Sequence, residues 1–414
     1  MRAAIGTLIL ATSLVQLANG FFGTLISLRV AIEDFGSTFA GIVLSSYFAG
    51  FTLAAVRCGR IIERVGHIRA YAAFAGLVAA ATAAMPLWVD PVAWLVLRAI
   101  VGFGCAGLFI TTESWLNAKA PPDQRGRVFA IYMVGTFAAL ALGQLLIARA
   151  EVTSVRPFNA IVALFALALV MVSTTRAEAP RIAAGAALPI RQLVHAAPIA
   201  VAGCLLSGIM SGTFYSLLPA WAQGEGIDRR TIALFMFAAV AGGLAFQVPV
   251  GWWSDAADRR RVLAMLAVGF AGAAVALVVL PHSMPIVLAL AALLGGFLST
   301  LYPVCVAHAH DCMAGDRVVA VSGRLILVSG IGSVIGPLLG TWIMAGFGIN
   351  GVLYFMAVTA AVLAMLAWSR STRVAAPPHE ERSFDILTPQ ASPLAHALGA
   401  LGDRASRSAA APDR

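Results

Sequence analysis

Charged residues are scarce in this chain of 414 residues, at 11% against about 25% in an average soluble protein. Hydrophobic residues reach 60%, and the mean hydropathy is +0.89. A soluble globule must cover itself with polar groups, so it cannot bury this much apolar surface. The composition therefore excludes an intrinsically disordered chain, a disulfide-rich secreted domain and almost any cytosolic enzyme, and leaves a polytopic membrane protein.

Lysine and cysteine are also rare. Lys119 is the single lysine among 28 basic residues and lies in no glycine-rich loop, so the chain has no Walker A motif and is not by itself an ATP-driven pump. The five cysteines lie in apolar runs or beside basic clusters, which indicates no disulfide framework. The net charge of +9 comes from short clusters without a continuous basic stripe, so we expect no nucleic-acid partner.

Long apolar runs fill most of the chain. A bilayer core about 30 Å thick requires about 20 apolar residues of helix. The sequence therefore predicts an all-α integral membrane protein with twelve transmembrane helices. Their expected limits are 5–28, 38–57, 70–89, 91–116, 127–148, 158–175, 198–221, 231–250, 262–281, 285–307, 318–345 and 351–369.

Basic residues between these spans are distributed unevenly. Cytosolic segments of membrane proteins carry an excess of Lys and Arg. With the N-terminus in the cytosol, the segments before the tail place fifteen basic residues inside and five outside, and cleaving the first span as a signal peptide would invert this bias. We therefore expect both termini in the cytosol and the chain in the cytoplasmic (inner) membrane. The five outer residues are Arg29, Arg149, Arg156, Arg229 and Arg230.

The longest internal connection divides the chain. Residues 1–176 hold an N-terminal set of six spans, 177–197 form a basic, Ala-rich cytosolic loop, and 198–370 hold a C-terminal set of six. Residues 371–414 carry much of the remaining charge and five prolines, which predicts a disordered cytosolic tail.

A short motif occurs once in each set, as GRIIERVGHIR from Gly59 and GWWSDAADRRR from Gly251. The two starts are 251 − 59 = 192 residues apart, close to half of the folded region. Each copy has a glycine, an acid four residues later and then arginines. Parallel repeats related by an axis along the membrane normal are typical of one group of transporters. The motif residues are Gly59, Glu63, Arg64, Gly66, Arg69, Gly251, Asp255, Arg259 and Arg260.

This paired motif resembles the cytosolic signature of the major facilitator superfamily, which reads Gly, three residues, Asp-Arg, one residue, Gly and two basic residues. Each copy here is partial: His67 and Ile68 replace two basic residues, and Ala256 and Asp258 replace Arg and Gly. Arg98, Gly102 and Gly104 resemble the fourth-helix motif of the superfamily. The stretches SSYFAG and LGQLLI, and Glu-Ser after the glycine-rich fourth span, are most similar to its YcaD-like branch, whose substrates are largely unassigned.

A third motif lies in an unusual place. Gly332, Gly336, Pro337 and Gly340 resemble an antiporter motif that normally marks the fifth span, whereas here they fall in the eleventh. This departure weakens any inference of drug antiport and leaves a helix-packing role.

The resemblance implies two pseudo-symmetric six-helix halves that rock about a central solute site. It also implies that Glu63 and Asp255 latch the halves together on the cytosolic side in the outward-open state; the alternative is that they are orientation charges only. The motif glycines Gly59, Gly66 and Gly251 are expected at tight turns, where positive φ or close helix approach favours glycine.

Three charged residues lie well inside spans, where an ionised group is costly and is a functional candidate by default. Glu113 is a candidate proton carrier or, alternatively, a packing group with a salt bridge or hydrogen bonds. Arg98 is a candidate for binding or coupling, or a structural charge near the outer interface. Arg324 either meets an anionic group or extends to the cytosolic face. Arg98 and Glu113 are fifteen residues apart, within about 60° of one helix face and about 22 Å apart along the axis.

Polar residues at helical spacing suggest which helices line the cavity, although small and polar residues also hold membrane helices together. The cavity candidates are Gln16, Asn19, Ser207, Ser211, Tyr215 and Tyr302. Two other patterns are rejected. Gly102, Gly104 and Gly107 match a dinucleotide motif but lie inside a span. His308 and His310 are two residues apart on a helix and point in different directions, so we expect no metal site.

The sequence thus predicts a secondary active transporter that moves a small solute by rocker-switch alternating access, with the proton as a candidate coupling ion. We expect a monomer in the lipid bilayer, no enzymatic activity and no cofactor, because the chain offers no nucleophile–base pair in an aqueous pocket. The alternative is a non-transporting sensor or scaffold built on the same fold.

Overall fold

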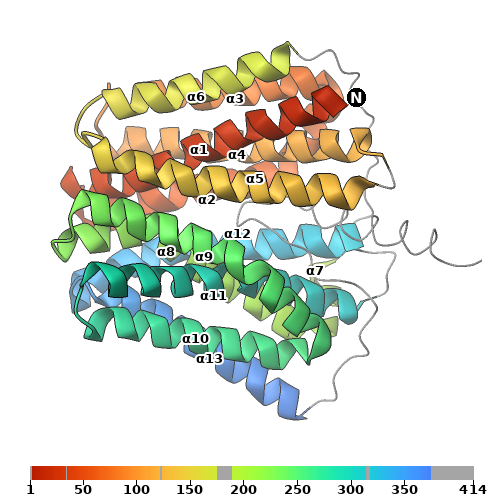
Figure 1. Ribbon diagram of the computed structural model, residues 1–414, viewed down its shortest axis with the longest axis vertical. Coiled ribbons are helices and arrows are strands. Elements are labelled where there is room, and N and C mark those ends of the chain that lie inside the picture. Colours follow the sequence, from red (N-terminus) through yellow and green to blue (C-terminus); the bar gives the residue numbers. More distant parts are fainter. Residues whose placement is uncertain (1, 34, 122–123, 175–188, 314–317, 374–414) are drawn as a thin grey trace, which may run out of the picture.

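The computed structural model describes residues 2–33, 35–121, 124–174, 189–313 and 318–373 (Figure 1), and the side chains of 2–4 and 318–319 are not among those described. The described residues form helices and contain no strand. Twelve helices have 18 to 31 residues. They are α1 (Arg2–Ile32), α2 (Gly36–Val65), α3 (His67–Ala84), α4 (Pro91–Lys119), α5 (Arg125–Leu145), α6 (Arg156–Ser173), α8 (Pro198–Gly224), α9 (Arg229–Ala256), α10 (Arg259–Val279), α11 (Met284–Asp311), α12 (Val318–Phe347) and α13 (Gly351–Arg373).

These helices agree with the fold predicted from the apolar runs. Eleven of the described helices are long and apolar enough to cross a membrane. The remaining long helix, α3, has 18 residues and begins with His67 and Arg69 in its first turn. It packs against α4 and α6 as part of the same bundle. Short segments complete the described chain, namely the 3-10 helix η2 (Leu146–Arg149) and the seven-residue helix α7 (Ile190–Ala196).

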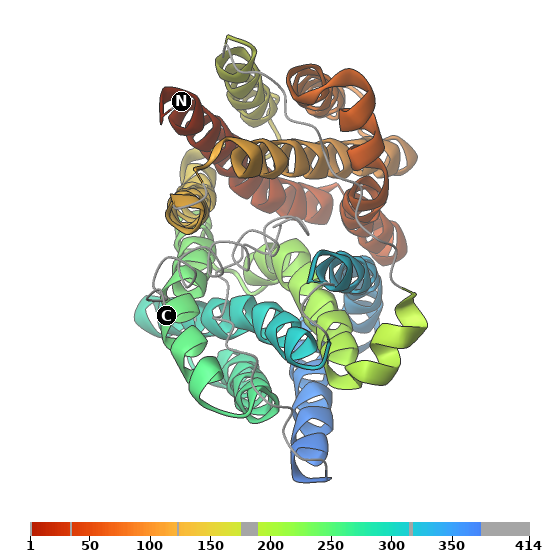
Figure 2. The same cartoon turned by 90° about the vertical axis from the view of Figure 1, so that its right-hand side faces the viewer.

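The long helices form two groups with equivalent packing (Figures 1 and 2). Helix α1 contacts α5 and α6, as α8 contacts α12 and α13. Helices α2 and α4 cross as α9 and α11 do, and the pair α3–α6 corresponds to α10–α13. The two groups meet through α2–α12, α5–α9 and α1–α8. Each half is therefore a six-helix unit, and three helix pairs join the halves.

Glycines at the helix crossings repeat between the halves. A Cβ on Gly50 would lie 1.9 Å from the Ala99 carbonyl oxygen, and a Cβ on Gly102 would lie 1.9 Å from the Tyr47 carbonyl oxygen. In the second half, Gly242 and Gly295 approach α11 and α9 in the same way. The offsets are 242 − 50 = 192 and 295 − 102 = 193 residues, which match the spacing of the motif. Close backbone approach therefore recurs at equivalent helix crossings in the two halves.

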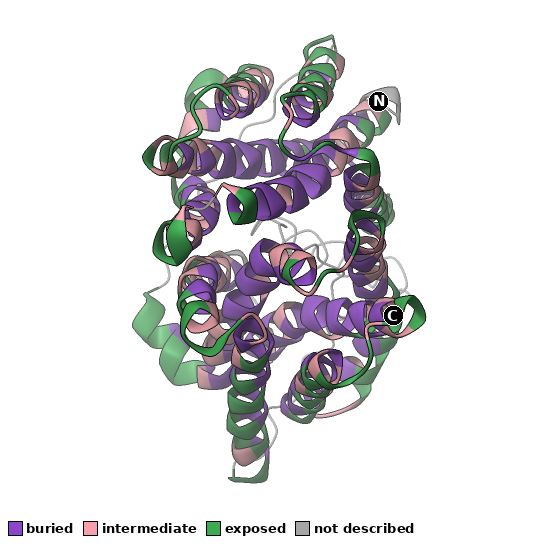
Figure 3. Cartoon of the chain, turned by 90° about the vertical axis from the view of Figure 1, so that its left-hand side faces the viewer, coloured by how far each residue is buried: buried purple, intermediate pink, exposed green. Residues whose placement is uncertain are grey.

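The two ends of the bundle differ in what they carry. We call the end at which α1 begins and α2 ends the terminal face, which is on the right in Figure 1, and the other end the opposite face. The N-terminus and the loops α2–α3, α4–α5 and α9–α10 lie at the terminal face. The loops at Gly226 and Gly348, both with positive φ, lie at the opposite face. Buried residues face the interior and exposed residues lie mainly on the outside of the bundle (Figure 3).

Several boundaries differ from the sequence prediction, among them the end of α9, which continues to Ala256 instead of 250. Helix α2 continues to Val65, eight residues beyond the expected span, so the first motif copy is largely helical. Helix α3 ends at Ala84 instead of continuing to 89, because Pro86 has no N–H to extend the helix. Part of the predicted connecting loop is the helix α7. The predicted disordered tail at 371–414 is wrong for its first three residues, which belong to α13. The rest of that tail and the rest of the connection, at 175–188, lie outside the described residues.

The expected turn with positive φ occurs at one of the three motif glycines. Gly66 ends α2 with φ 81°, and its N–H donates to the Ile62 carbonyl oxygen at 2.8 Å. Gly59 lies within α2, and an added Cβ would meet no atom within 4 Å, so neither a turn nor close packing requires glycine there. Gly251 lies within α9 and is not among the glycines with positive φ. The prediction of a turn is therefore wrong for Gly59 and Gly251.

Candidate functional site

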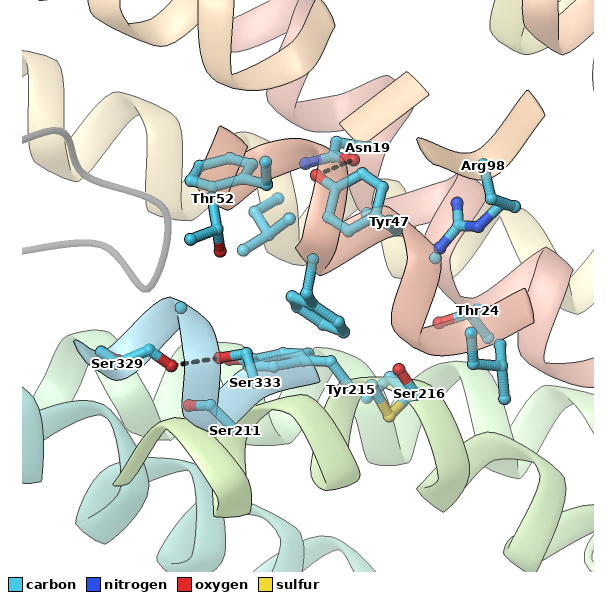
Figure 4. A pocket seen from close by; sticks show the side chains of 18 of the residues that line it. Asn19, Thr24, Tyr47, Thr52, Arg98, Ser211, Tyr215, Ser216, Ser329 and Ser333 are labelled. Atoms are coloured by element: carbon cyan, nitrogen blue, oxygen red, sulfur yellow. Dashed lines mark hydrogen bonds between the residues drawn. The ribbon is translucent and has the colours of Figure 1, made fainter. Parts of the chain in front are cut away.

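A cavity lies between the two halves, near the middle of the bundle (Figure 4). Its walls come from α1, α2, α4 and α5 of the first half and from α8, α9 and α12 of the second. Hydroxyl and amide groups alternate on these walls with the rings of Phe48, Phe51 and Tyr215. The polar lining residues are Asn19, Thr24, Tyr47, Thr52, Arg98, Gln144, Ser211, Tyr215, Ser216, Ser329 and Ser333.

The wall contains one ionised side chain among its lining residues, that of Arg98 on α4. Arg98 is 5% exposed. Its guanidinium carbon lies 4.7 Å from the centroid of the Tyr47 ring and 5.4 Å from that of Phe22. Contacts of this kind attract a cation to the aromatic face. The arginine is therefore positioned by two rings at the cavity wall.

Hydrogen bonds fix the neighbours of Arg98. The Tyr47 hydroxyl donates to Asn19 Oδ1 at 3.3 Å, and Asn19 Nδ2 donates to Gln16 Oε1 at 3.5 Å. On the same helix, the Thr24 hydroxyl donates to Gln144 Oε1 at 2.5 Å. These bonds orient the polar stripe of α1 toward α2 and α5, so one face of α1 forms much of the first-half wall.

The cavity is closed toward the opposite face by contacts between the halves. The Ser27 hydroxyl donates to the Ser216 carbonyl oxygen, and Arg229 Nη1 donates to the Ala150 carbonyl oxygen at 2.6 Å. A Cβ on Gly41 would lie 2.2 Å from Thr341 Oγ1, so α2 and α12 are tightly packed there. Another close contact, between Thr52 Oγ1 and Gly330, joins the same helices at mid-height.

Glu113 is not among the cavity-lining residues. Glu113, on α4, is 1% exposed and accepts a hydrogen bond at 3.1 Å from the hydroxyl of Tyr132 on α5. Its neighbour Ser114 interacts with His67 Nε2 at 3.0 Å. Arg98 and Glu113, which were predicted to share a helix face, therefore have different environments. Arg98 lies at the cavity, and Glu113 lies inside the first half near the terminal face.

The second motif copy forms a buried ion network. Arg259 Nη2 lies 3.0 Å from Asp255 Oδ1, and Arg259 Nε lies 2.8 Å from Asp311 Oδ2, where both the Arg259 and Asp311 side chains are 2% exposed. Arg259 also donates to the Ser254 hydroxyl at 3.1 Å. These bonds join the ends of α9, α10 and α11 within the second half.

The adjacent Asp258 begins α10. It accepts the backbone N–H of Arg260 at 3.0 Å and pairs with the Arg260 side chain at 2.9 Å. Partial burial acts to raise the pKa of Asp258, but the hydrogen bonds and charge of Arg260 outweigh this and hold the pKa below its usual range. Arg260 also donates to the Arg370 carbonyl oxygen of α13 at 3.3 Å.

The first copy is arranged differently. Glu63, Arg64 and Arg69 are exposed, and no ion pair joins them to the part of the chain that the structure describes. The two acids proposed as latches, Glu63 and Asp255, are thus not in an ion pair across the halves: Asp255 pairs within its own half.

The remaining candidates divide by position. Asn19, Ser211 and Tyr215 lie on the cavity, whereas Gln16, Ser207, Tyr302 and Arg324 are not among its lining residues. The antiporter-like motif packs α12 against α8: a Cβ on Gly332 would lie 2.2 Å from the Leu205 carbonyl oxygen, and one on Gly336 would lie 2.3 Å from that of Ile209. Gly340 faces Leu217, and Pro337 lies inside α12.

Sequence reasoning missed several residues of the site. Tyr47 lay in the stretch SSYFAG, which was noted only for its family resemblance, and Asp311 lay next to the rejected position His310. A signal did exist for two others. Thr24 and Ser216 both line the cavity and are 216 − 24 = 192 residues apart, as Asn19 and Ser211 are (211 − 19 = 192). The repeat offset links Ser216 to Thr24, which the helical spacing had not selected, so neither was found.

Known proteins are similar to this chain in sequence. The family model of the Major Facilitator Superfamily matches residues 8–244 and 201–405. A relative described as an uncharacterized MFS-type transporter YcaD, from Shigella flexneri serotype 5b (strain 8401), is 30% identical over 364 residues, which cover 86% of this chain and 93% of the relative. The protein of the same description from Escherichia coli O139:H28 (strain E24377A / ETEC) gives the same values.

Solved structures share the fold. A bacterial homologue of the human lysosomal transporter Spinster, in an inward-facing and occupied conformation, has a TM-score of 0.74 and 14% identity, covering 90% of this chain and 97% of that one. A D-xylose–proton symporter has a TM-score of 0.67 and 18% identity, covering 91% and 99%. Together with the family match, they favour solute transport over a sensor or scaffold. The chain belongs to the Major Facilitator Superfamily of membrane transporters, which is not a class of enzymes.

Proposed function

We propose that the chain moves a small solute across the cytoplasmic membrane by alternating access, with the central cavity as the solute site. The observation that carries this proposal is that polar residues of both halves line one cavity between them. A site built from two bodies can change its access when the bodies rotate relative to one another. The solute, and no nucleic acid, is then the partner, and one chain supplies the whole cavity as a monomer.

The access state follows from where the halves touch. The contacts described above between the halves lie at mid-height or toward the opposite face, and Asp255 is engaged within its own half. The positive-residue bias favours a cytosolic terminal face with both termini inside. We therefore assign an inward-facing state, in which the latch of Glu63 and Asp255 is released.

The experiment that tests alternating access uses Gly41. Gly41→Val is expected to prevent closure at the opposite face, because the added side chain collides with Thr341 and the Pro337 carbonyl oxygen. Solute levels inside and outside cells should differ between wild type and vector, and the variant should reduce that difference at least about tenfold. A cysteine at Ser329 should react with an impermeant thiol reagent in inside-out vesicles of wild type and much less in the variant.

Gly76→Val on α3 is the matched control, since no atom lies within 4 Å of its added Cβ. It should leave the solute difference and the cysteine labelling unchanged. Wild-type cells whose solute levels equal those of vector cells in every growth condition would contradict the proposed transport.

Protons are the proposed driving ion, and Glu113 the residue that carries them. The carboxyl is buried and hydrogen-bonded to Tyr132. Nearby on α3 and α4, buried polar atoms of His67, Tyr71 and Trp115 have no hydrogen-bond partner in the described structure. Such atoms are where ordered water is found. Water at these atoms would supply a proton route from the terminal face to Glu113.

Glu113→Gln is therefore expected to make transport independent of pH, because the amide cannot exchange a proton. Transport of the identified solute is measured from pH 5.5 to 8.5 with wild type, Glu113→Gln and the exposed control Glu151→Gln, which should keep the wild-type profile. If wild-type transport does not vary with pH, or if Glu113→Gln retains the wild-type variation, Glu113 is not the proton carrier.

A further inference from the structure

The guanidinium of Arg98 has no negative partner within the structure. No hydrogen bond or ion pair joins it to the described residues, and its Nε is buried without a partner. The acids on neighbouring helices are engaged elsewhere or distant: Glu33 pairs with Arg29, and Glu113 lies about 22 Å along α4. Arg98 is therefore a buried cation facing a cavity whose other described lining residues are uncharged.

Such a cation is costly unless something compensates for it. An arginine at the centre of a membrane helix costs about 2.5–3.5 kcal/mol on insertion scales. Cation–π contacts with the two rings are weaker, at about 0.5–2 kcal/mol. The N–H donors of Arg98 make no hydrogen bond to the described residues and remain available for a ligand that enters the cavity.

Planar guanidinium donors match carboxylate and phosphate oxygens, which they bind in pairs. We propose that Arg98 binds the negative group of the transported solute, so that the cavity carries a small, water-soluble organic anion. This inference rests on the proposed function, because it assumes that the cavity is the solute site. The hydroxyls of Ser211, Ser329 and Ser333 on the facing helices then bind polar groups on the rest of the molecule.

The internal repeat supports a solute with a single anionic group. The position equivalent to Arg98 at the repeat offset is Ala291, since 291 − 98 = 193. The second half therefore contributes no matching cation to the cavity, and among the described lining residues none is acidic. A cavity with one cation on one side and hydroxyls on the other fits a molecule with a negative end and a neutral, hydrogen-bonding end.

The test measures binding to the purified full-length protein. The unfolding temperature of the protein is measured in the presence of each of three extracts of bacterial cells. These are small molecules retained by an anion-exchange column, small molecules that pass through it, and a lipid extract. The active compound is then purified, and its dissociation constant is measured for wild type, Arg98→Gln, Arg98→Lys and the exposed control Arg261→Gln. The same compound is measured inside and outside cells that express each variant.

Stabilisation by the retained fraction alone is expected. Arg98→Gln should weaken binding of the purified anion at least about tenfold, as for loss of a charged hydrogen bond, and Arg98→Lys should weaken it less. Arg261→Gln should match wild type. If Arg98→Gln does not fold, the charge of the wild-type ligand and the Arg98→Lys result carry the test.

The other outcomes overturn the inference in distinguishable ways. A neutral or cationic solute that binds and is transported would contradict the anionic class and leave the transport proposal standing. Stabilisation by the lipid extract alone would also contradict it, because the anion would be a lipid headgroup. If no compound binds and no solute level depends on the wild-type protein, both the inference and the proposed function fail.

Discussion

Replacing Gly102 with leucine is expected to leave no monodisperse folded protein. The Cβ alone would lie 1.9 Å from the Tyr47 carbonyl oxygen, 2.7 Å from its carbonyl carbon and 3.0 Å from its Cα. These are backbone atoms, which cannot turn aside as a flexible side chain can. Helices α2 and α4 would have to separate, and this crossing also places the Tyr47 ring over Arg98. Overpacking by even a methyl group costs about 1–3 kcal/mol, so Gly102→Ala should unfold at a lower temperature.

Size-exclusion chromatography in detergent and thermal unfolding measure both effects. Gly76→Leu adds the same side chain to α3 at a position with no atom within 4 Å of the Cβ, and it should elute and unfold as wild type does. Gly295→Leu should fail as Gly102→Leu does, because its Cβ would lie 1.9 Å from the Ala239 carbonyl oxygen. Wild-type elution and unfolding of Gly102→Leu would mean that the α2–α4 crossing is wider than described.

Arg259→Leu is expected to destabilise the second half by about 3–5 kcal/mol, the usual cost of removing one partner of a buried ion pair. The Asp311 carboxylate, 2% exposed, would lose the guanidinium that lies 2.8 Å away. The double variant Arg259→Leu/Asp311→Leu removes both charges and should recover most of the loss, since well-packed apolar pairs often replace buried ion pairs at little cost.

Thermal unfolding of the two single variants and the double variant in detergent measures this coupling. Arg261→Leu is the control, because it removes an exposed arginine from the same turn of α10. A loss for Arg259→Leu no larger than that for Arg261→Leu would show that the pair does not hold α10 to α11. A double variant as unstable as the sum of the single ones would show that the two residues act separately.

The sequence predicted the helices better than the site, for physical reasons. Apolar length and charge placement are local properties, so all twelve long helices were expected, and the end of α3 was missed only because the apolar count ignored Pro86. The cavity depends on which faces of distant helices meet. Helical spacing identified Asn19 and Ser211, which line it, but the same spacing also selected Gln16 and Ser207, which do not.

Charged residues in the spans indicated where burial costs free energy, but not which residues surround each charge. Arg98 and Glu113 were both singled out because they are ionisable within apolar runs. Their different environments follow from Phe22 and Tyr47 on one side and Tyr132 on the other, three aromatic residues that a single sequence does not distinguish from the rest of the core. Asp311 was hidden for a similar reason: its partner Arg259 is 52 residues away in the chain.

The mid-height contact between Thr52 and Gly330 opposes a pathway that is open to both faces at once. Gly330 is 12 residues from the start of α12 and 17 from its end, so the helix extends about 18 Å to one side of the contact and about 26 Å to the other. A rigid rotation about this point that parts the halves at one face must bring them together at the other. A continuous open pore would therefore require the halves to separate at mid-height as well, at this contact and along the pairs α5–α9 and α1–α8.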